Sequence, residues 1–367
     1  MTTTLPRSLL HFTITVVLLG LTVLIAPAAQ AAPFAYITNE NSSNVSVIDT
    51  ATNTVVATVP VGAFPEAVGI NPAGTRVYAA SVGPRTVSVI DTTSNTVIAT
   101  VPVGNNPQGV AVNPAGARVY VANAGSNNIS VINTATNTVT ATVVVGTFPT
   151  GVAVNPAGTL VYVANSTSNN VSVIDIASNT VIATVAAGTR AYGVAINPTG
   201  TRVYVGNSNS NNVSVIDTAT NTVVATVPVG ASPEGVAVNP AGTRVYVANA
   251  SGNTVSVIDT TSNTVIATVA GLSNPAGLGV NPAGTRVYVA NNTSTNNVSV
   301  IDTATNTIVA TIPAGSDPFA FGLFIGPDVV LPAGAIGPIP TLSQWSLLLL
   351  GVLLATLGVA RLRRLNG

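Results

Sequence analysis

The chain has 367 residues, of which 47% are hydrophobic and only 6% are charged, and its formal net charge at pH 7 is zero. All of the basic side chains are arginines and they form no stripe that could neutralise phosphates, which argues against a nucleic-acid-binding protein. The lack of cysteine excludes disulfides, thiolate metal sites and thiol nucleophiles.

The first segment, residues 1–31, has the features of a secretion signal. An arginine near the start precedes an apolar run over 12–25, and Ala29 and Ala31 fit the small-x-small cleavage rule. We predict cleavage after Ala31 by signal peptidase, with an uncleaved N-terminal anchor as the alternative. The single histidine, His11, lies in this segment, so a cleaved chain would carry no imidazole, thiol or lysine amine.

From residue 34 to residue 326 the sequence repeats with a period of about 42 residues. The period is set by a tyrosine, and an Asp or Asn follows each tyrosine at the end of a later apolar run. A period in the low forties with four strand-like runs per unit is typical of a propeller blade. The tyrosines are Tyr36, Tyr78, Tyr120, Tyr162, Tyr204, Tyr246 and Tyr288.

One unit shows the predicted blade. Apolar runs at 109–112, 118–122, 129–132 and 138–145 are separated by an Asn-Pro-Ala-Gly turn and by Asn/Ser-rich loops, which predicts a four-stranded antiparallel meander. The fourth run carries a proline in several units, and proline is tolerated mainly at sheet edges, so the fourth strand should form the rim and the first should line the axis. The prolines are Pro60, Pro102, Pro228 and Pro313.

The chain enters the repeat at the second strand of a unit, so the first blade lacks its inner strand. Residues 321–325, which follow the seventh rim strand, should supply it. We therefore predict an all-β, seven-bladed β-propeller with four-stranded antiparallel blades, closed by a C-terminal inner strand.

Three recurring motifs carry a family resemblance. The runs Tyr36-Ile37-Thr38-Asn39 and Tyr120-Val121-Ala122-Asn123, with Val-Ser-Val-Ile-Asp and Asn-Pro-Ala-Gly-Thr, resemble the YVTN family of β-propeller repeats over roughly 34–326. That family occurs in bacterial exported and archaeal surface-layer proteins. The resemblance implies a propeller and export, but no particular reaction.

The C-terminal part has a different composition. Residues 327–338 form a Pro/Gly linker, and a short motif, an apolar stretch over 346–360 and an arginine cluster follow. We expect a transmembrane helix with the tryptophan at the interface and the arginines in the cytoplasm. The motif is Ile339, Pro340, Thr341, Leu342, Ser343, Gln344 and Trp345, and the arginines include Arg361, Arg363 and Arg364.

Residues 339–364 resemble the IPTL-type C-terminal protein-sorting signal of Gram-negative bacteria. This resemblance implies a transient anchor in the inner membrane, processing by an exosortase-like enzyme, and delivery to the cell surface or the medium. A permanent C-terminal anchor is the alternative.

Arginines that begin second strands should face the acidic residues that end third strands. The expected pairs are Arg76–Asp91, Arg202–Asp217, Arg244–Asp259 and Arg286–Asp302. The aspartates should also cap the turns that follow them, with a metal- or ligand-binding ring of aspartates as the alternative. The repeated tyrosines should pack between blades, with an aromatic ligand platform as the alternative.

One position varies while its neighbours repeat. It lies just before each inner strand, on loops around one channel mouth, and binding residues often lie on loops held by a rigid scaffold. We predict that this ring is a recognition surface, with neutral drift as the alternative. Its members are Glu66, Gln108, Thr150, Tyr192, Glu234, Ala276 and Phe319.

The leading functional hypothesis is a non-catalytic exported protein that binds or scaffolds at the cell surface, in adhesion or in the envelope, with an unidentified protein or polysaccharide as partner. Neither a cofactor nor a metal is expected, and catalysis would depend on Glu66, Glu234 and a few aspartates. Two alternatives are a propeller enzyme of the lactonase or oxidoreductase kind, and a surface layer that assembles through rim strands.

Overall fold

The computed structural model describes residues 30–31, 33–327 and 329–330. These residues form strands and connecting turns, with a single turn of 3-10 helix, η1 (Ala124–Ser126). Most of the predicted signal peptide and linker, and the whole of the predicted C-terminal helix and sorting signal over 339–364, lie outside the described residues. Within the described part, no helix has the length and hydropathy needed to cross a bilayer.

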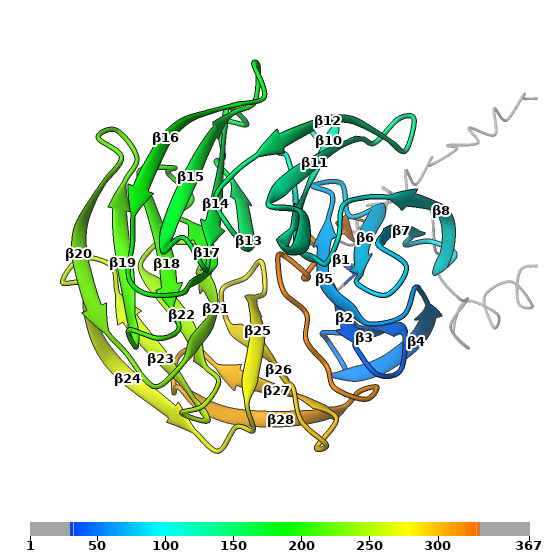
Figure 1. Ribbon diagram of the computed structural model, residues 1–367. Helices are drawn as coiled ribbons and strands as arrows, with labels where there is room; N and C mark the ends of the chain where they lie inside the picture. Colours follow the sequence, from blue (N-terminus) through cyan, green and yellow to red (C-terminus); the bar gives the residue numbers. More distant parts are fainter. Residues whose placement is uncertain (1–29, 32, 328, 331–367) are drawn as a thin grey trace, which may run out of the picture. The chain divides into compact units, whose positions relative to one another are not determined.

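Seven sheets stand around one axis as the blades of a β-propeller (Figure 1). Six blades have four strands joined in sequence order, and blade 1 has three. The blades are β2 (Phe34–Asn39), β3 (Asn44–Asp49) and β4 (Thr54–Pro60) in blade 1; β5 (Pro65–Ile70), β6 (Arg76–Ser81), β7 (Thr86–Asp91) and β8 (Thr96–Pro102) in blade 2; β9 (Pro107–Val112), β10 (Arg118–Asn123), β11 (Asn128–Asn133) and β12 (Thr138–Val144) in blade 3; β13 (Pro149–Val154), β14 (Leu160–Asn165), β15 (Asn170–Asp175) and β16 (Thr180–Ala186) in blade 4; β17 (Ala191–Ile196), β18 (Arg202–Asn207), β19 (Asn212–Asp217) and β20 (Thr222–Pro228) in blade 5; β21 (Pro233–Val238), β22 (Arg244–Asn249), β23 (Thr254–Asp259) and β24 (Thr264–Ala270) in blade 6; and β25 (Pro275–Val280), β26 (Arg286–Asn291), β27 (Asn297–Asp302) and β28 (Thr307–Pro313) in blade 7.

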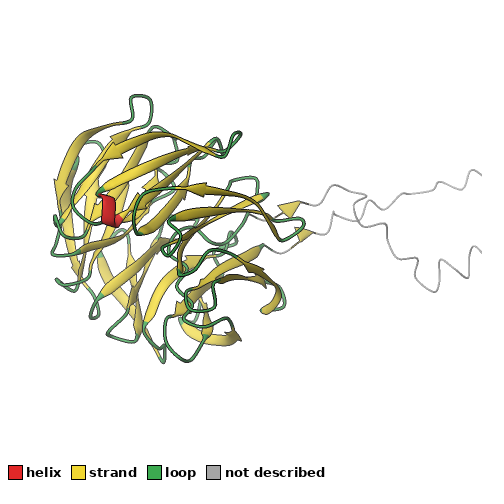
Figure 2. Ribbon diagram, turned by 45° about the vertical axis from the view of Figure 1, so that its right-hand side comes forward, coloured by secondary structure: helices red, strands yellow, loops and turns green. Residues whose placement is uncertain are grey.

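In the six four-stranded blades the first strand lines the axis and the fourth strand forms the rim, as predicted (Figure 1), and in blade 1 the rim strand is β4. Figure 2 shows the same strands and connecting loops from a view turned by 45°. Each of the four rim prolines is the last residue of a rim strand, in β4, β8, β20 and β28. We call the end of the propeller where the inner strands begin the loop face. The opposite end, which carries the Asn-Pro-Ala-Gly turns, is the turn face. Two further short strands, β1 (Gln30–Ala31) and β29 (Val329–Val330), pair with each other.

Blade 1 is completed by residues 318–326, which we call the closing segment. It bridges β2 in an antiparallel sense at Asn39–Pro318 and at Ala35–Ile325. The prediction that the C-terminal part of the repeat supplies the missing inner strand is therefore confirmed in position. The segment forms isolated bridges and not a regular strand, and the positive φ of Ala320 and Gly322 breaks the extended backbone within it. It is also bonded to blade 2, where the amide of Val68 donates to the carbonyl of Phe321 at 2.9 Å.

The core lies between blades, since each blade is sandwiched by two others and its middle strands are buried on both faces. The seven repeated tyrosines are at most 2% exposed. Tyr288 of blade 7 packs into the core of blade 1, and its hydroxyl donates to Asn53 Oδ1 at 3.0 Å. The predicted blade-to-blade packing of the tyrosines is confirmed, which removes them as an exposed aromatic platform.

Candidate functional site

The seven variable positions do form one ring at the loop face. The prediction that they lie on loops before the inner strands is wrong by a short shift in the strand boundaries, because six of them are the second residues of β5, β9, β13, β17, β21 and β25. Phe319 takes the equivalent place in the closing segment. The amide of Gly277 donates to the carbonyl of Phe319 at 3.0 Å, so the closing segment is bonded to blade 7 at this level. The structure therefore brings the predicted residues together around the axis.

Glycines make the ring tight. A Cβ on Gly109 would lie 2.0 Å from the carbonyl oxygen of Thr150, and a Cβ on Gly193 would lie 2.0 Å from that of Glu234. No real Cβ is accepted at such a distance from a backbone atom, so only glycine lets neighbouring inner strands approach this closely. The same contact recurs at Gly151, Gly235 and Gly277.

The ring residues are not equally available to a partner. Glu66, Gln108, Glu234 and Phe319 are partly exposed. By contrast, Thr150 and Ala276 are each 1% exposed and Tyr192 is 8% exposed. The latter three side chains therefore build the ring and do not present a contact surface. Thr150 shows this role most clearly, because its hydroxyl donates to the carbonyl of Tyr192 at 2.9 Å.

An aromatic contact joins the ring residue Tyr192 to the closing segment. The ring centroids of Tyr192 and Phe321 are 5.3 Å apart with an interplanar angle of 90°, and Phe319 lies 5.9 Å from Phe321. Tyr192 belongs to blade 5 and Phe321 to the closing segment in blade 1, so their contact crosses the axis. The Arg190 guanidinium carbon lies 5.7 Å from the Tyr192 ring centroid, in reach of a cation–π interaction.

Three carboxylates share the loop face near this aromatic contact. Burial raises the pKa of Glu66 to about 7, the charge of Glu40 adds to the rise, and the Gln108 amide opposes it. Burial also raises the pKa of Glu234, against the effect of Arg190. For Glu40, burial is again the main cause of a raised pKa. The opening of the channel at the loop face, which we call the channel mouth, is thus a partly desolvated acidic surface with aromatic groups beside it.

Glu40 was not singled out from the sequence. It follows Asn39 at the start of a loop where the other units carry small or amide side chains, such as Ala124 and Ser166. This departure from the repeat is the feature of the sequence by which Glu40 could have been identified as a candidate site residue. Arg190 was likewise not singled out, and Phe321 was expected only as part of the closing strand, because nothing local in the sequence shows that blades 1 and 5 meet across the axis.

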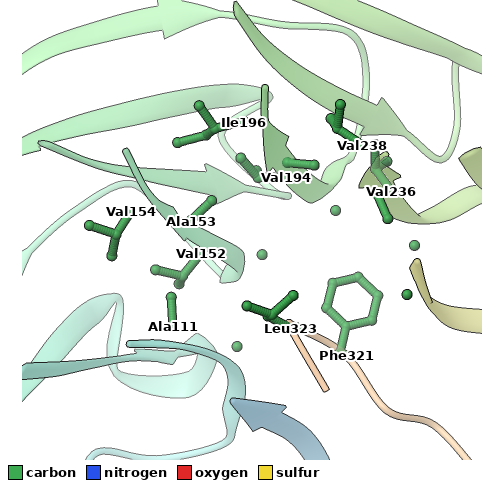
Figure 3. Close-up of a pocket in the computed structure, with 18 of the residues that line it drawn as sticks. Ala111, Val152, Ala153, Val154, Val194, Ile196, Val236, Val238, Phe321 and Leu323 are labelled. Atoms are coloured by element: carbon green, nitrogen blue, oxygen red, sulfur yellow. The ribbon is translucent and has the colours of Figure 1, made fainter. Parts of the chain in front are cut away.

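Beyond the aromatic contact, the channel holds an apolar cavity of about 270 Å³. Its wall is formed by the inner strands, and it reaches the turn face, where Pro156 and Pro198 contribute to the lining. Figure 3 shows Phe321 and Leu323 of the closing segment facing Val152, Val194 and Val236. The sequence indicated which strands line the axis but did not indicate this cavity.

The aspartates at the ends of the third strands act as turn caps. Asp91 Oδ1 accepts from the amides of Thr93 at 2.9 Å and Ser94 at 3.0 Å, and the bond from Ser94 is the main cause of its lowered pKa. No group of three or more His, Cys, Asp or Glu that could hold a metal occurs among the described residues.

Three of the four expected ion pairs form. Arg76–Asp91, Arg202–Asp217 and Arg286–Asp302 are in contact through one guanidinium nitrogen and Oδ2. Arg244 and Asp259 face each other in the same register, but no such contact joins them, so the prediction of a fourth ion pair is wrong. Register and capping are the same in all four blades. An exposed ion pair contributes little free energy, so an arginine rotamer that contacts the aspartate and one that does not are similar in stability.

Comparison with known proteins agrees with this architecture. Residues 28–191 match a family model described as "Lactonase, 7-bladed beta-propeller", and residues 191–312 match a "YNCE-like beta-propeller". Residues 338–364 match the "IPTL-CTERM motif". No curated protein matches the chain.

Two solved structures are similar in fold. The first is Kuenenia stuttgartiensis hydrazine synthase, with a TM-score of 0.67 and 24% identity over 77% of this chain and 99% of that chain. The second is a functionally unknown protein from Desulfotomaculum acetoxidans DSM 771, with a TM-score of 0.70 and 18% identity over 81% of this chain and 100% of that chain. The fold defines a seven-bladed β-propeller. With the matched motif, the protein is a β-propeller that carries a C-terminal sorting signal.

Proposed function

We propose that this protein is an exported, non-catalytic binding or scaffolding protein of the Gram-negative envelope, and that its loop face is the recognition surface. The sorting motif at 338–364 indicates export to the envelope and processing by a sorting enzyme. In the proposal, signal peptidase cleaves after Ala31, the C-terminal helix anchors the precursor in the inner membrane, and an exosortase-like enzyme then delivers the chain to the surface or the medium.

The unpartnered polar atoms at the channel mouth are the observation that carries the binding role. Glu66 Oε2 and Gln108 Oε1 are buried and accept no hydrogen bond from the described residues. A buried acceptor without a donor costs free energy, which a ligand N–H or O–H would recover. Because both are acceptors and Phe319 lies in the same ring, the mouth suits a donor-rich partner, either a protein segment or a polysaccharide.

A lactonase-type hydrolase is the second candidate. The lactonase family model covers residues 28–191, and a carboxylate with a pKa of about 7 is suited to act as a general base near neutral pH. The cavity, however, lies on the far side of the Tyr192–Phe321 contact from Glu66. The geometry around Glu66 therefore favours surface recognition over the enclosure of a small substrate.

Binding of the purified, labelled chain to envelopes of cells that lack their own copy tests the first proposal. The double variant E66Q/E234Q keeps the size of both side chains, and with F319A it should weaken binding about tenfold or more, since hydrogen bonds to charged groups contribute about 1.5–3 kcal/mol each. Tyr192 is left unchanged because it is buried. R202Q, on the turn face, is the matched control.

Unchanged binding by the triple variant would contradict the recognition role. Periodate or protease treatment of the envelopes beforehand distinguishes a polysaccharide from a protein partner. Hydrolysis of a lactone panel by the wild type, abolished in E66Q, would support the enzyme instead. Cell fractionation with intact-mass measurement tests the two processing sites separately from binding.

A further inference from the structure

The inner strand β17 has an axial edge with free backbone groups. It is the first strand of its sheet, so no strand lies beside it on the side of the axis. The amide of Asn197, just after β17, bonds to the carbonyl of Arg202 at 3.0 Å, on the side of β18. Amides alternate in direction along a strand, so those of Val194 and Ile196 face the axis. Among the described residues, neither amide bonds to the backbone of another blade or of the closing segment.

The equivalent edge of β5 is occupied, and it shows what such an edge accepts. The amide of Val68 donates to the carbonyl of Phe321 at 2.9 Å, and the amide of Ile70 donates to the carbonyl of Leu323 at 3.1 Å. These two donors hold the repeat positions of the free amides of β17. The last four residues of β5 are buried, whereas the last three of β17 are partly exposed. The occupant of β5 is thus an uncharged stretch of backbone with apolar side chains.

The channel cavity of about 270 Å³ lies between the closing segment and the uncovered edges (Figure 3). Of the residues that line it, none is charged and only Asn197 has a polar side chain. That side chain is already bonded within its own turn, because it donates to the Thr201 hydroxyl and accepts from the amide of Arg202, both at 3.0 Å. The free polar groups of the wall are therefore backbone groups.

The composition of this wall selects the class of ligand. A hydrocarbon would bury the backbone groups without partners, which costs free energy. A charged ligand would lose its hydration and meet no opposite charge. An uncharged ligand with amide groups and apolar side chains avoids both costs, because it can add a strand to a free edge. The cavity equals about nine water molecules at about 30 Å³ each, so the ligand must be short.

We propose that the channel binds a short, uncharged, apolar peptide segment, which adds its backbone to the axial edge of β17. Blade 5 lies across the axis from the closing segment, because Tyr192 contacts Phe321. The ligand enters from the turn face, since the glycine-packed ring lies at the other end. Leu323, which is 63% exposed, faces Val194 and Val236 in the cavity and would contact the ligand side chain (Figure 3). This site is separate from the loop-face surface of the proposed function.

Photolabelling of the full chain in lipid nanodiscs tests the proposal. N-acetyl-Gly-Leu-amide is a suitable probe, because its acetyl and leucine carbonyls are two residues apart, as are those of Phe321 and Leu323. A version with a diazirine in the leucine side chain should label β17 and β21, as mapped by mass spectrometry, and excess unlabelled probe should reduce this labelling about tenfold or more. The same diazirine probe with a free carboxylate in place of the amide should label about tenfold less, since the wall offers it no counter-charge.

The variant L323W should abolish the labelling, because the indole would fill the cavity. L323A is the matched control and should keep it. Leu323 is largely exposed, so both variants should retain the wild-type melting midpoint. Strong labelling of L323W, equal labelling by the carboxylate, or no labelling inside the channel would each overturn the proposal. Loss of labelling with cyclohexane as competitor, at the level seen with the peptide, would also overturn it, because the backbone groups would then not be recognised. The loop-face binding assay uses neither this probe nor these variants, so the two proposals fail separately.

Discussion

Replacement of Gly193 by alanine tests whether close approach of the inner strands holds the ring together. The new Cβ would lie 2.0 Å from the carbonyl oxygen of Glu234, 3.1 Å from its carbonyl carbon and 3.3 Å from the backbone nitrogen of Val236, so all of the obstacles are backbone atoms.

 An ordinary contact between such atoms is about 3.5 Å, so β17 and β21 would have to separate by roughly 1.5 Å. Overpacking of this kind costs about 1–3 kcal/mol. We expect the upper end of that range, about 3 kcal/mol, because backbone atoms cannot rotate out of the way as a side chain can.

Thermal unfolding followed by circular dichroism measures this cost. For a domain of this size 3 kcal/mol corresponds to a fall of about 5 °C in the unfolding midpoint. G206A is the matched control in the same blade, because other blades carry alanine at that position and its Cβ would meet only the Val236 side chain at 3.2 Å and backbone at 3.3 Å or more. It should be neutral or slightly stabilising. A midpoint for G193A equal to that of G206A would refute the reasoning.

Two further predictions concern buried polar groups. The carboxyl of Glu66, with its pKa raised to about 7, holds its proton more tightly in the folded than in the unfolded chain, so stability should fall as pH rises from about 4.5 to 7, by on the order of 3 kcal/mol at most. E66Q should flatten this part of a curve of melting midpoint against pH, and an unchanged slope would contradict the assignment. Y288F should cost about 1 kcal/mol, because the Tyr288 hydroxyl donates to Asn53. Y162F should cost nothing, because the Tyr162 hydroxyl is buried with no hydrogen-bond partner among the described residues; equal losses in urea unfolding would count against this distinction.

The fold was predictable because each blade repeats the same short sequence motifs. The tyrosine period, the Asn-Pro-Ala-Gly turns and the rim prolines each specify a local structure, and all three agree on the strand order that the structure shows. Closure was predictable for a related reason, since a ring that begins at a second strand must receive its first strand from the other end of the chain.

The candidate site was predictable only in outline. Sequence variation at one repeat position located the ring, but it could not show that Thr150 and Ala276 are buried while Glu66 and Glu234 are partly exposed. That difference depends on how each side chain packs near the axis. The prediction of an ion pair between Arg244 and Asp259 was wrong for a different reason. Strand register places the two side chains opposite each other but does not fix their rotamers.

The closing segment joins the stability of the ring to the structure of the mouth. The amide of Phe321 donates to the carbonyl of Glu66 at 3.1 Å, and its own carbonyl accepts from Val68, so the backbone that closes the propeller also fixes the strand that carries Glu66. The Phe321 side chain meanwhile meets Tyr192 across the axis. Opening blade 1 would therefore release the Glu66 strand and remove the aromatic contact in the same step. For this reason the loop-face surface should exist only in the closed ring, and any partner that binds it should also stabilise the closure.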